Sequence, residues 1–196
     1  MRAIRRVLQV SVLTLAFGVV SAAVPSNAHA FKLGLDAIWV PVGAHEVKEK
    51  SGPRLRDDGH EVGSWGLSAQ GELSFEYLSG GLKVNYFNEG LDLVTADRKV
   101  EDRRKEIDVN VMGRLQVPQV ALSVFGETGL VFGAPFEKVG FNAGFGVEYT
   151  LFTVSIVGFN LGLAGQYTDF DTELRNQPVA TDSWRFSAFA GLEFGM

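Results

Sequence analysis

Apolar and polar residues alternate with a period of two along almost the whole chain after its first 30 residues. The clearest stretch is 139–151, where Phe141 and Phe145 share one parity while Asn142 and Glu148 share the other. Side chains of a β-strand point to opposite faces in turn, so this pattern predicts strands with one apolar and one polar face. We therefore predict an all-β fold of eight strands, at roughly 31–40, 64–78, 82–88, 106–117, 120–132, 139–151, 154–168 and 184–196.

Charged residues within these predicted strands all fall on the polar parity. They are Lys32, Asp36, Glu72, Glu76, Lys83, Asp108, Arg114, Glu127, Glu148, Arg185 and Glu193. One face of the sheet is therefore free of charge along every strand. A sheet with such a strict partition is expected to curl or close, with the charged face on one side of the wall and the apolar face on the other.

The predicted connections alternate in length. The long ones are 41–63, 89–105 and 169–183, and the very short ones lie near 79–81, 118–119 and 152–153. The segment 133–138 falls on the long side but is brief. Long loops on one side and short turns on the other are typical of an outer-membrane barrel, whose short turns face the periplasm. A β-bulge is expected near Ile156 and Val157, where the alternation fits less well.

The three tryptophans and four tyrosines all lie on the apolar parity near strand ends. Trp39, Trp65, Tyr86, Tyr167 and Trp184 map to the long-loop end, and Tyr77 and Tyr149 map to the short-turn end. Amphipathic rings prefer the boundary between membrane and water. The sequence thus predicts two aromatic belts that face outward. The alternative is a core of ordinary aromatic residues in a soluble barrel, which would not sort all seven rings to strand ends.

Residues 1–30 have the features of a secretory signal peptide. Three arginines within the first six residues precede an apolar stretch, Val7 to Val24, and Ala28-His29-Ala30 is a small-x-small cleavage site. Cleavage would make Phe31 the first residue of a mature barrel domain, 31–196. An uncleaved membrane anchor is the alternative.

The mature chain, 31–196, resembles the small eight-stranded outer-membrane barrels of Gram-negative bacteria, the OmpA, OmpX and OmpW-like group. Its last strand resembles the family's assembly signal through Leu192, Phe194 and Met196, although that signal usually ends in Phe and this chain ends in Met. The resemblance implies an antiparallel up-and-down transmembrane β-barrel in the outer membrane. It also implies a monomer that contacts outer-membrane lipid and lipopolysaccharide and meets the barrel assembly machinery during insertion.

Eight strands enclose a space that side chains just fill, so the polar parity predicts a plugged lumen. Unpaired charges would be costly there, and a guanidinium can bridge several carboxylates. We therefore expect Arg114 and Arg185 to be the centres of ion pairs with inward acids such as Glu72, Glu127 or Glu148. The excess of acids over bases leaves a gated ion path as the alternative. A soluble lipocalin-like barrel, with its polarity inverted, is the structural rival.

Three classes of function remain: a structural or surface-interaction barrel, a small channel or carrier, and a lipid-modifying enzyme. An enzyme would need a nucleophile and a base, but His45, His60, Ser51 and Ser64 have no dyad or triad spacing. The sequence assigns no catalytic residue, cofactor or metal. The absence of cysteine excludes disulfides, cysteine-ligated zinc and thiol catalysis. The net charge of −5 disfavours binding to nucleic acid.

Two charged segments suggest surface roles. The run Arg103-Arg104-Lys105 could contact lipopolysaccharide phosphates, and its simpler interpretation is a solvated loop. Residues Asp169-x-Asp171-x-Glu173 could hold calcium, but they lack the spacing and glycine of an EF-hand loop.

Overall fold

The structure is a computed structural model that describes residues 30–49, 54–56, 64–94, 99–117, 119–133, 138–174 and 177–195. Its strands are β1 (Ala30–Glu49), β2 (Arg54–Arg56), β3 (Ser64–Phe75), β4 (Leu78–Val94), β5 (Lys99–Gln116), β6 (Leu122–Gly133), β7 (Lys138–Val154), β8 (Val157–Leu174) and β9 (Gln177–Gly195). Within the described part of the chain, no helix is long and apolar enough to cross a membrane. The residues 1–29 of the expected signal peptide lie outside the described residues.

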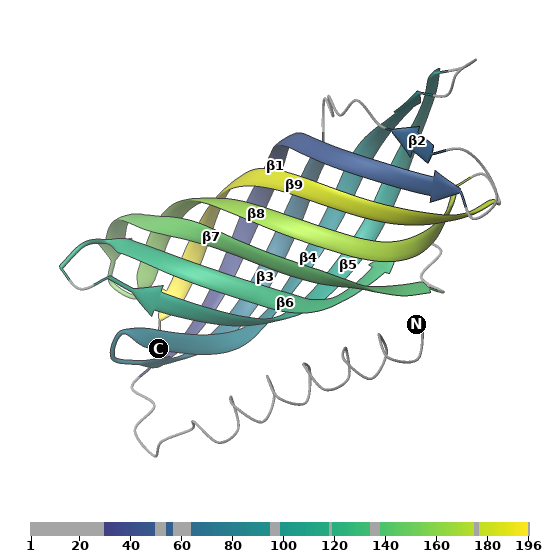
Figure 1. Cartoon of the computed structure of the whole chain (residues 1–196). Coiled ribbons are helices and arrows are strands. Elements are labelled where there is room, and N and C mark those ends of the chain that lie inside the picture. Colours follow the sequence, from purple (N-terminus) through teal and green to yellow (C-terminus); the bar gives the residue numbers. More distant parts are fainter. Residues whose placement is uncertain are drawn as a thin grey trace.

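The eight long strands form a closed antiparallel barrel (Figure 1). Each pairs with the next in chain order, and β1 closes the barrel by pairing with β9. Leu35, for example, lies opposite Ala69 of β3 and Leu192 of β9. The three-residue β2 pairs with the far end of β1 and lies outside this circuit. The expected all-β, eight-stranded up-and-down barrel is confirmed.

The barrel wall has the opposite polarity to that of a soluble barrel, because its apolar side chains point outward and its polar side chains point inward. Leu35, Phe145 and Leu163 on the outside are 57%, 63% and 61% exposed, whereas Asp36 and Asn142 on the inside are 6% and 0% exposed. A soluble lipocalin-like barrel would place the apolar parity inside. That alternative is therefore wrong, and the outer wall presents a surface suited to lipid.

Two of the three short turns differ from the prediction. They lie at 76–77 and 155–156 rather than near 79–81 and 152–153, and Glu76 and Ser155 have φ angles of 52° and 57°. The third connection falls where it was predicted, near 118–119, since β5 ends at Gln116 and β6 begins at Leu122. A two-residue turn preserves the parity of the residues that follow it, so the alternation runs through without a visible break. The predicted bulge near Ile156 and Val157 is also wrong, because Ile156 lies in the turn. The irregularity of this hairpin lies in β7, between Thr150 and Phe152.

On the opposite side, most of the predicted loops are strand. β1 continues to Glu49, β4 to Val94 and β8 to Leu174, while β5 begins at Lys99 and β9 at Gln177. Backbone pairing needs no apolar side chains, so the ladder continues where the charged sequence begins. The described residues of 41–49, 89–94, 99–105, 169–174 and 177–183 therefore project from the barrel as strand extensions (Figure 1).

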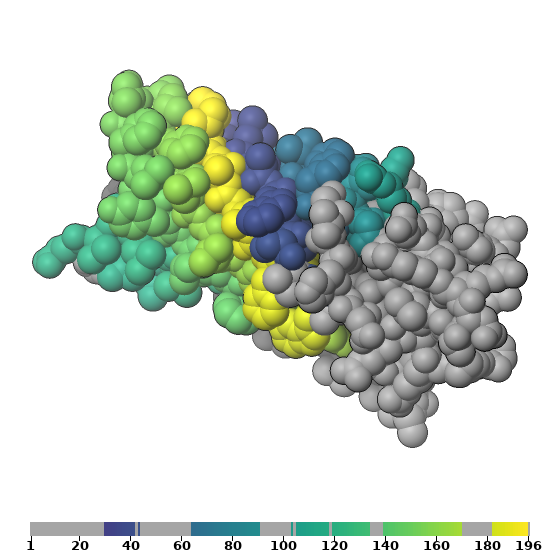
Figure 2. All heavy atoms as spheres, turned by 90° about the horizontal axis from the view of Figure 1, so that it is seen from above, coloured from purple at the N-terminus to yellow at the C-terminus, as the bar shows by residue number. Residues whose placement is uncertain are grey.

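β1 and β9 lie side by side along the wall (Figure 2), but their register shifts between Trp39 and Val42. Two residues of β1, Val40 and Pro41, here oppose the single Ser187 of β9. Proline has no backbone N–H to donate, so a bulge is one of the few places where a barrel strand accommodates it. The alternation of the sequence did not predict this bulge.

Candidate functional site in the barrel lumen

Arg114 of β5 is the centre of an ion-pair cluster near the short-turn end. Its guanidinium contacts Glu72 of β3 at 2.9 Å, Glu148 of β7, and Glu193 of β9 at 3.6 Å. Glu193 also pairs with Lys32 at 2.9 Å. Because these residues come from β1, β3, β5, β7 and β9, the cluster ties opposite walls of the barrel together across the lumen.

Arg185 of β9 is the centre of a second cluster, toward the end of the barrel where the strands extend beyond the predicted boundaries (the long-strand end). It is 1% exposed and contacts Glu89 at 2.7 Å, Glu106, and Asp108 at 3.9 Å. It also donates a hydrogen bond to Thr168 Oγ1 at 2.9 Å. The carboxylates come from β4 and β5, on the far side of the lumen from β9. Glu89 was missed in the sequence because it falls in the predicted loop 89–105. Glu106 is the first residue of the predicted strand 106–117 and lies on its polar parity, but it borders the charged run and was not included among the inward charges.

Other predicted lumen residues form smaller contacts. Lys83 pairs with Glu127 at 3.1 Å, and Ser68 donates a hydrogen bond of 2.6 Å to Asp36. The prediction that Glu76 faces the lumen is wrong. Glu76 is exposed in the turn between β3 and β4, because β3 ends sooner than predicted. Asp36, Lys83 and Glu127, together with the predicted residues of the two arginine clusters, line the lumen.

Phenylalanines also fill the lumen, although no inward phenylalanine was predicted from the sequence. Phe125 and Phe189 meet edge to face at 5.9 Å, and Lys83 Nζ lies 4.9 Å from the centre of the Phe125 ring. Phe87 lies under the Arg185 guanidinium at 4.0 Å. All three are on the polar parity, which was the available sequence signal. Cations held over rings and by carboxylates together give a packed plug.

Glycines on neighbouring strands make room for these rings. A Cβ added at Gly162 would overlap the Phe189 ring, and one added at Gly146 would overlap the Phe125 ring. Gly162→Val is therefore expected to destabilise the folded barrel by about 1–3 kcal/mol through overpacking. Gly113→Val is the control, because nothing lies within 4 Å of its Cβ position on the outer wall. Urea unfolding in lipid vesicles measures both, and equal effects would contradict a packed lumen.

The aromatic residues gather at the two ends of the outer wall. At the long-strand end, Trp65 and Tyr86 lie 5.8 Å apart and Tyr167 and Trp184 lie 5.2 Å apart, measured between ring centres. Trp39 is paired in register with Trp65. At the other end, Tyr149 is 46% exposed on β7, and Tyr77 is 47% exposed in a turn rather than in a strand.

In the closing strand β9, Leu192 lies on the outer wall and is 41% exposed, and Phe194 shares its parity and is partly exposed. Met196 lies outside the described residues.

Ser64, considered above as a possible nucleophile, is buried and accepts a hydrogen bond of 3.1 Å from the Gly90 N–H.

The candidates for surface chemistry are described only in part. The side chains of His45, His60, Ser51, Arg104, Asp171 and Glu173 lie outside the described ones. Arg103 and Lys105 are exposed on β5. Asp169 lies in β8 rather than in a loop, and the described residues contain no group of acids or histidines arranged to hold a metal ion.

Comparisons with known proteins agree with this architecture. No family model matches the chain, and no curated protein matches it significantly. Among solved structures, the outer membrane protein OprG from Pseudomonas aeruginosa is similar, with a TM-score of 0.51, 12% identity, and an alignment that covers 86% of this chain and 96% of OprG. The outer membrane protein AlkL, solved in lipid bilayers, aligns with a TM-score of 0.53 and 11% identity over 89% of this chain and 93% of AlkL. The chain therefore has the fold of the small eight-stranded outer-membrane barrels.

Proposed function

We propose that this chain is a non-enzymatic outer-membrane barrel whose lumen is sealed and whose role is structural or depends on its extracellular surface. The observation that carries the proposal is the pair of arginine clusters that cross the lumen. Arg114 and Arg185 are 6% and 1% exposed, and each is held by carboxylates from at least two other strands. Ion pairs that cross the lumen obstruct an aqueous path, and breaking a buried pair costs about 3–5 kcal/mol.

Planar-bilayer recording tests the seal. The wild-type barrel is expected to show no stable current steps after insertion, because its guanidiniums and phenylalanine rings occupy the lumen. The double variant Arg114→Ala/Arg185→Ala is the comparison, since removing both centres is expected to produce conductance. Stable open steps in the wild-type barrel would contradict the proposal.

The second candidate is a small channel or carrier, and one observation favours it. The side-chain amides of Asn110 and Asn142 are fully buried, and neither has a hydrogen-bond partner among the described protein atoms. Buried amides of this kind are ordinarily satisfied by water, so the lumen around Asn110 and Asn142 suits hydration. Wild-type conductance would favour this candidate over the sealed barrel.

The surface role rests on Arg103 and Lys105. Tyr86 of the aromatic belt is paired with Ile107, and Lys105 and Arg103 follow on the same outward parity of β5, beyond the belt. Two cations at this height suit the phosphates of lipopolysaccharide. Arg103→Ala/Lys105→Ala is expected to lower lipopolysaccharide retention, while Lys105→Arg, which keeps the charge, retains it. Unchanged retention in the double variant would contradict this role.

A further inference from the structure

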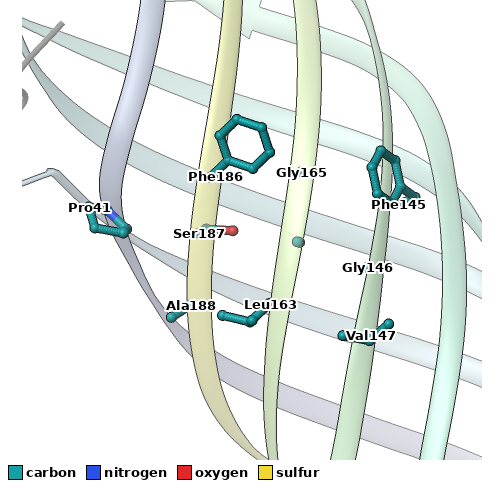
Figure 3. Close-up of a pocket in the computed structure, with 10 residues that line it drawn as sticks. Pro41, Phe145, Gly146, Val147, Leu163, Gly165, Phe186, Ser187 and Ala188 are labelled. Atoms are coloured by element: carbon teal, nitrogen blue, oxygen red, sulfur yellow. The ribbon is translucent and has the colours of Figure 1, made fainter.

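A groove with almost wholly apolar lining crosses the outer wall over β7, β8, β9 and β1 (Figure 3). Its volume is about 270 Å³. Phe145, Leu163 and Phe186 form its sides, and Pro41 stands at the β1 end. These residues are on the outward parity, so the groove opens away from the lumen and its charges.

The floor of the groove follows from the register. Gly165 lies between Phe145 of β7 and Phe186 of β9, and a Cβ at this position would be 3.3 Å from the Phe186 ring and 3.7 Å from the Phe145 ring. In the next row, Ala188 lies between Leu163 and the β1 strand. Small residues between large ones on neighbouring strands therefore leave a depression in this part of the wall.

The position of the groove determines what can reach it. Tyr167 and Trp184 are paired with each other two residues further toward the long-strand end than Gly165 and Phe186. They form part of the aromatic belt at that end. The groove thus begins just inside the belt and is continuous with the lipid-facing wall. Hydrocarbon is the medium at this depth, and a lipid on the long-strand side extends its chains inward from the belt.

We propose that this groove binds one acyl chain of an outer-leaflet lipid, held in place rather than exchanging freely with the surrounding bilayer. The proposal rests on the outer-membrane placement of the barrel proposed above. The chain packs between the Phe145 and Phe186 rings and over Gly165, gaining contacts that a flat wall would not provide. It would be an ordered lipid on one face of the barrel only.

Paramagnetic relaxation tests this directly on the wild-type protein. The barrel is placed in nanodiscs that contain a small fraction of phosphatidylcholine spin-labelled on its acyl chain, and methyl resonances are recorded. The Leu163 methyls in the groove are expected to broaden more than those of Leu82 and Val109, which are 50% and 41% exposed on β4 and β5. Equal broadening at all three would show ordinary bilayer contact and overturn the proposal.

A matched pair of variants tests the fit. Gly165→Leu fills the groove, whereas Gly113→Leu adds the same side chain at an open position on the outer wall. Gly165→Leu is expected to lower the number of barrels that retain a lipid in native mass spectrometry by about tenfold, and Gly113→Leu to leave it unchanged. Retention of a second copy of the chain in place of lipid would overturn the proposal. A barrel that inserts but shows no preferred lipid contradicts this inference alone, whereas failure to insert contradicts the proposed function.

Discussion

Arg185→Met is expected to lower the free energy of unfolding by about 3–5 kcal/mol, because it removes the cation that holds buried carboxylates. Glu89, Glu106 and Asp108 would lose their shared arginine, and the Phe87 ring would lose the guanidinium above it. Urea unfolding in lipid vesicles, followed by the difference in gel migration before and after boiling, measures the change.

Two further variants separate charge from general damage. Arg185→Lys keeps the charge but not the planar fork that reaches several partners, so it is expected to recover only part of the stability. Lys105→Met removes an exposed base on the outer side of β5 and is expected to have little effect. If Arg185→Met is as stable as the wild type, the lumen is wetter than these contacts imply and the channel candidate gains support.

Phe145→Arg is expected to destabilise the barrel in a bilayer by about 2–4 kcal/mol, the cost of an arginine near the middle of the lipid-facing wall. Phe145 is 63% exposed on β7 and pairs with Gly165 and Gly126 on the neighbouring strands. The measurement is again unfolding from lipid vesicles.

Val139→Arg is the matched control for this substitution. Val139 is 55% exposed on the same face of β7 but lies beyond Ala143, which is paired with Tyr167 of the aromatic belt. Arginine is expected to cost only about 0–1 kcal/mol there, as it does near the membrane boundary. An equal cost at both positions would contradict the assignment of the apolar wall to lipid.

The alternation of the sequence was sufficient to predict the barrel and the direction in which most side chains point. Both depend on a period of two, which every strand must obey. The turn positions were not predictable in the same way. A two-residue turn at 76–77 keeps the parity of its flanks, so Glu76 appeared to continue a strand when it lies in the turn.

The contents of the lumen were only partly predictable. Arg114 and Arg185 follow from their parity, but the choice of partners depends on which walls face one another across the barrel. Glu89 was hidden because the dense charge of 89–105 suggests a loop, whereas a ladder continues as long as its backbone is paired. The inward phenylalanines broke the rule that apolar residues face lipid, and glycines such as Gly162 make room for them.

The central claim is that the apolar parity faces lipid and the polar parity faces a closed lumen. The chain has no cysteine, so single nitroxide labels can be introduced at 145 and 142 of β7 and at 163 and 166 of β8 without other changes. In reconstituted vesicles, labels at 145 and 163 are expected to be relaxed by oxygen dissolved in the bilayer, and labels at 142 and 166 to be shielded from it. The reverse pattern, or equal access at all four positions, would contradict the assignment of inside and outside.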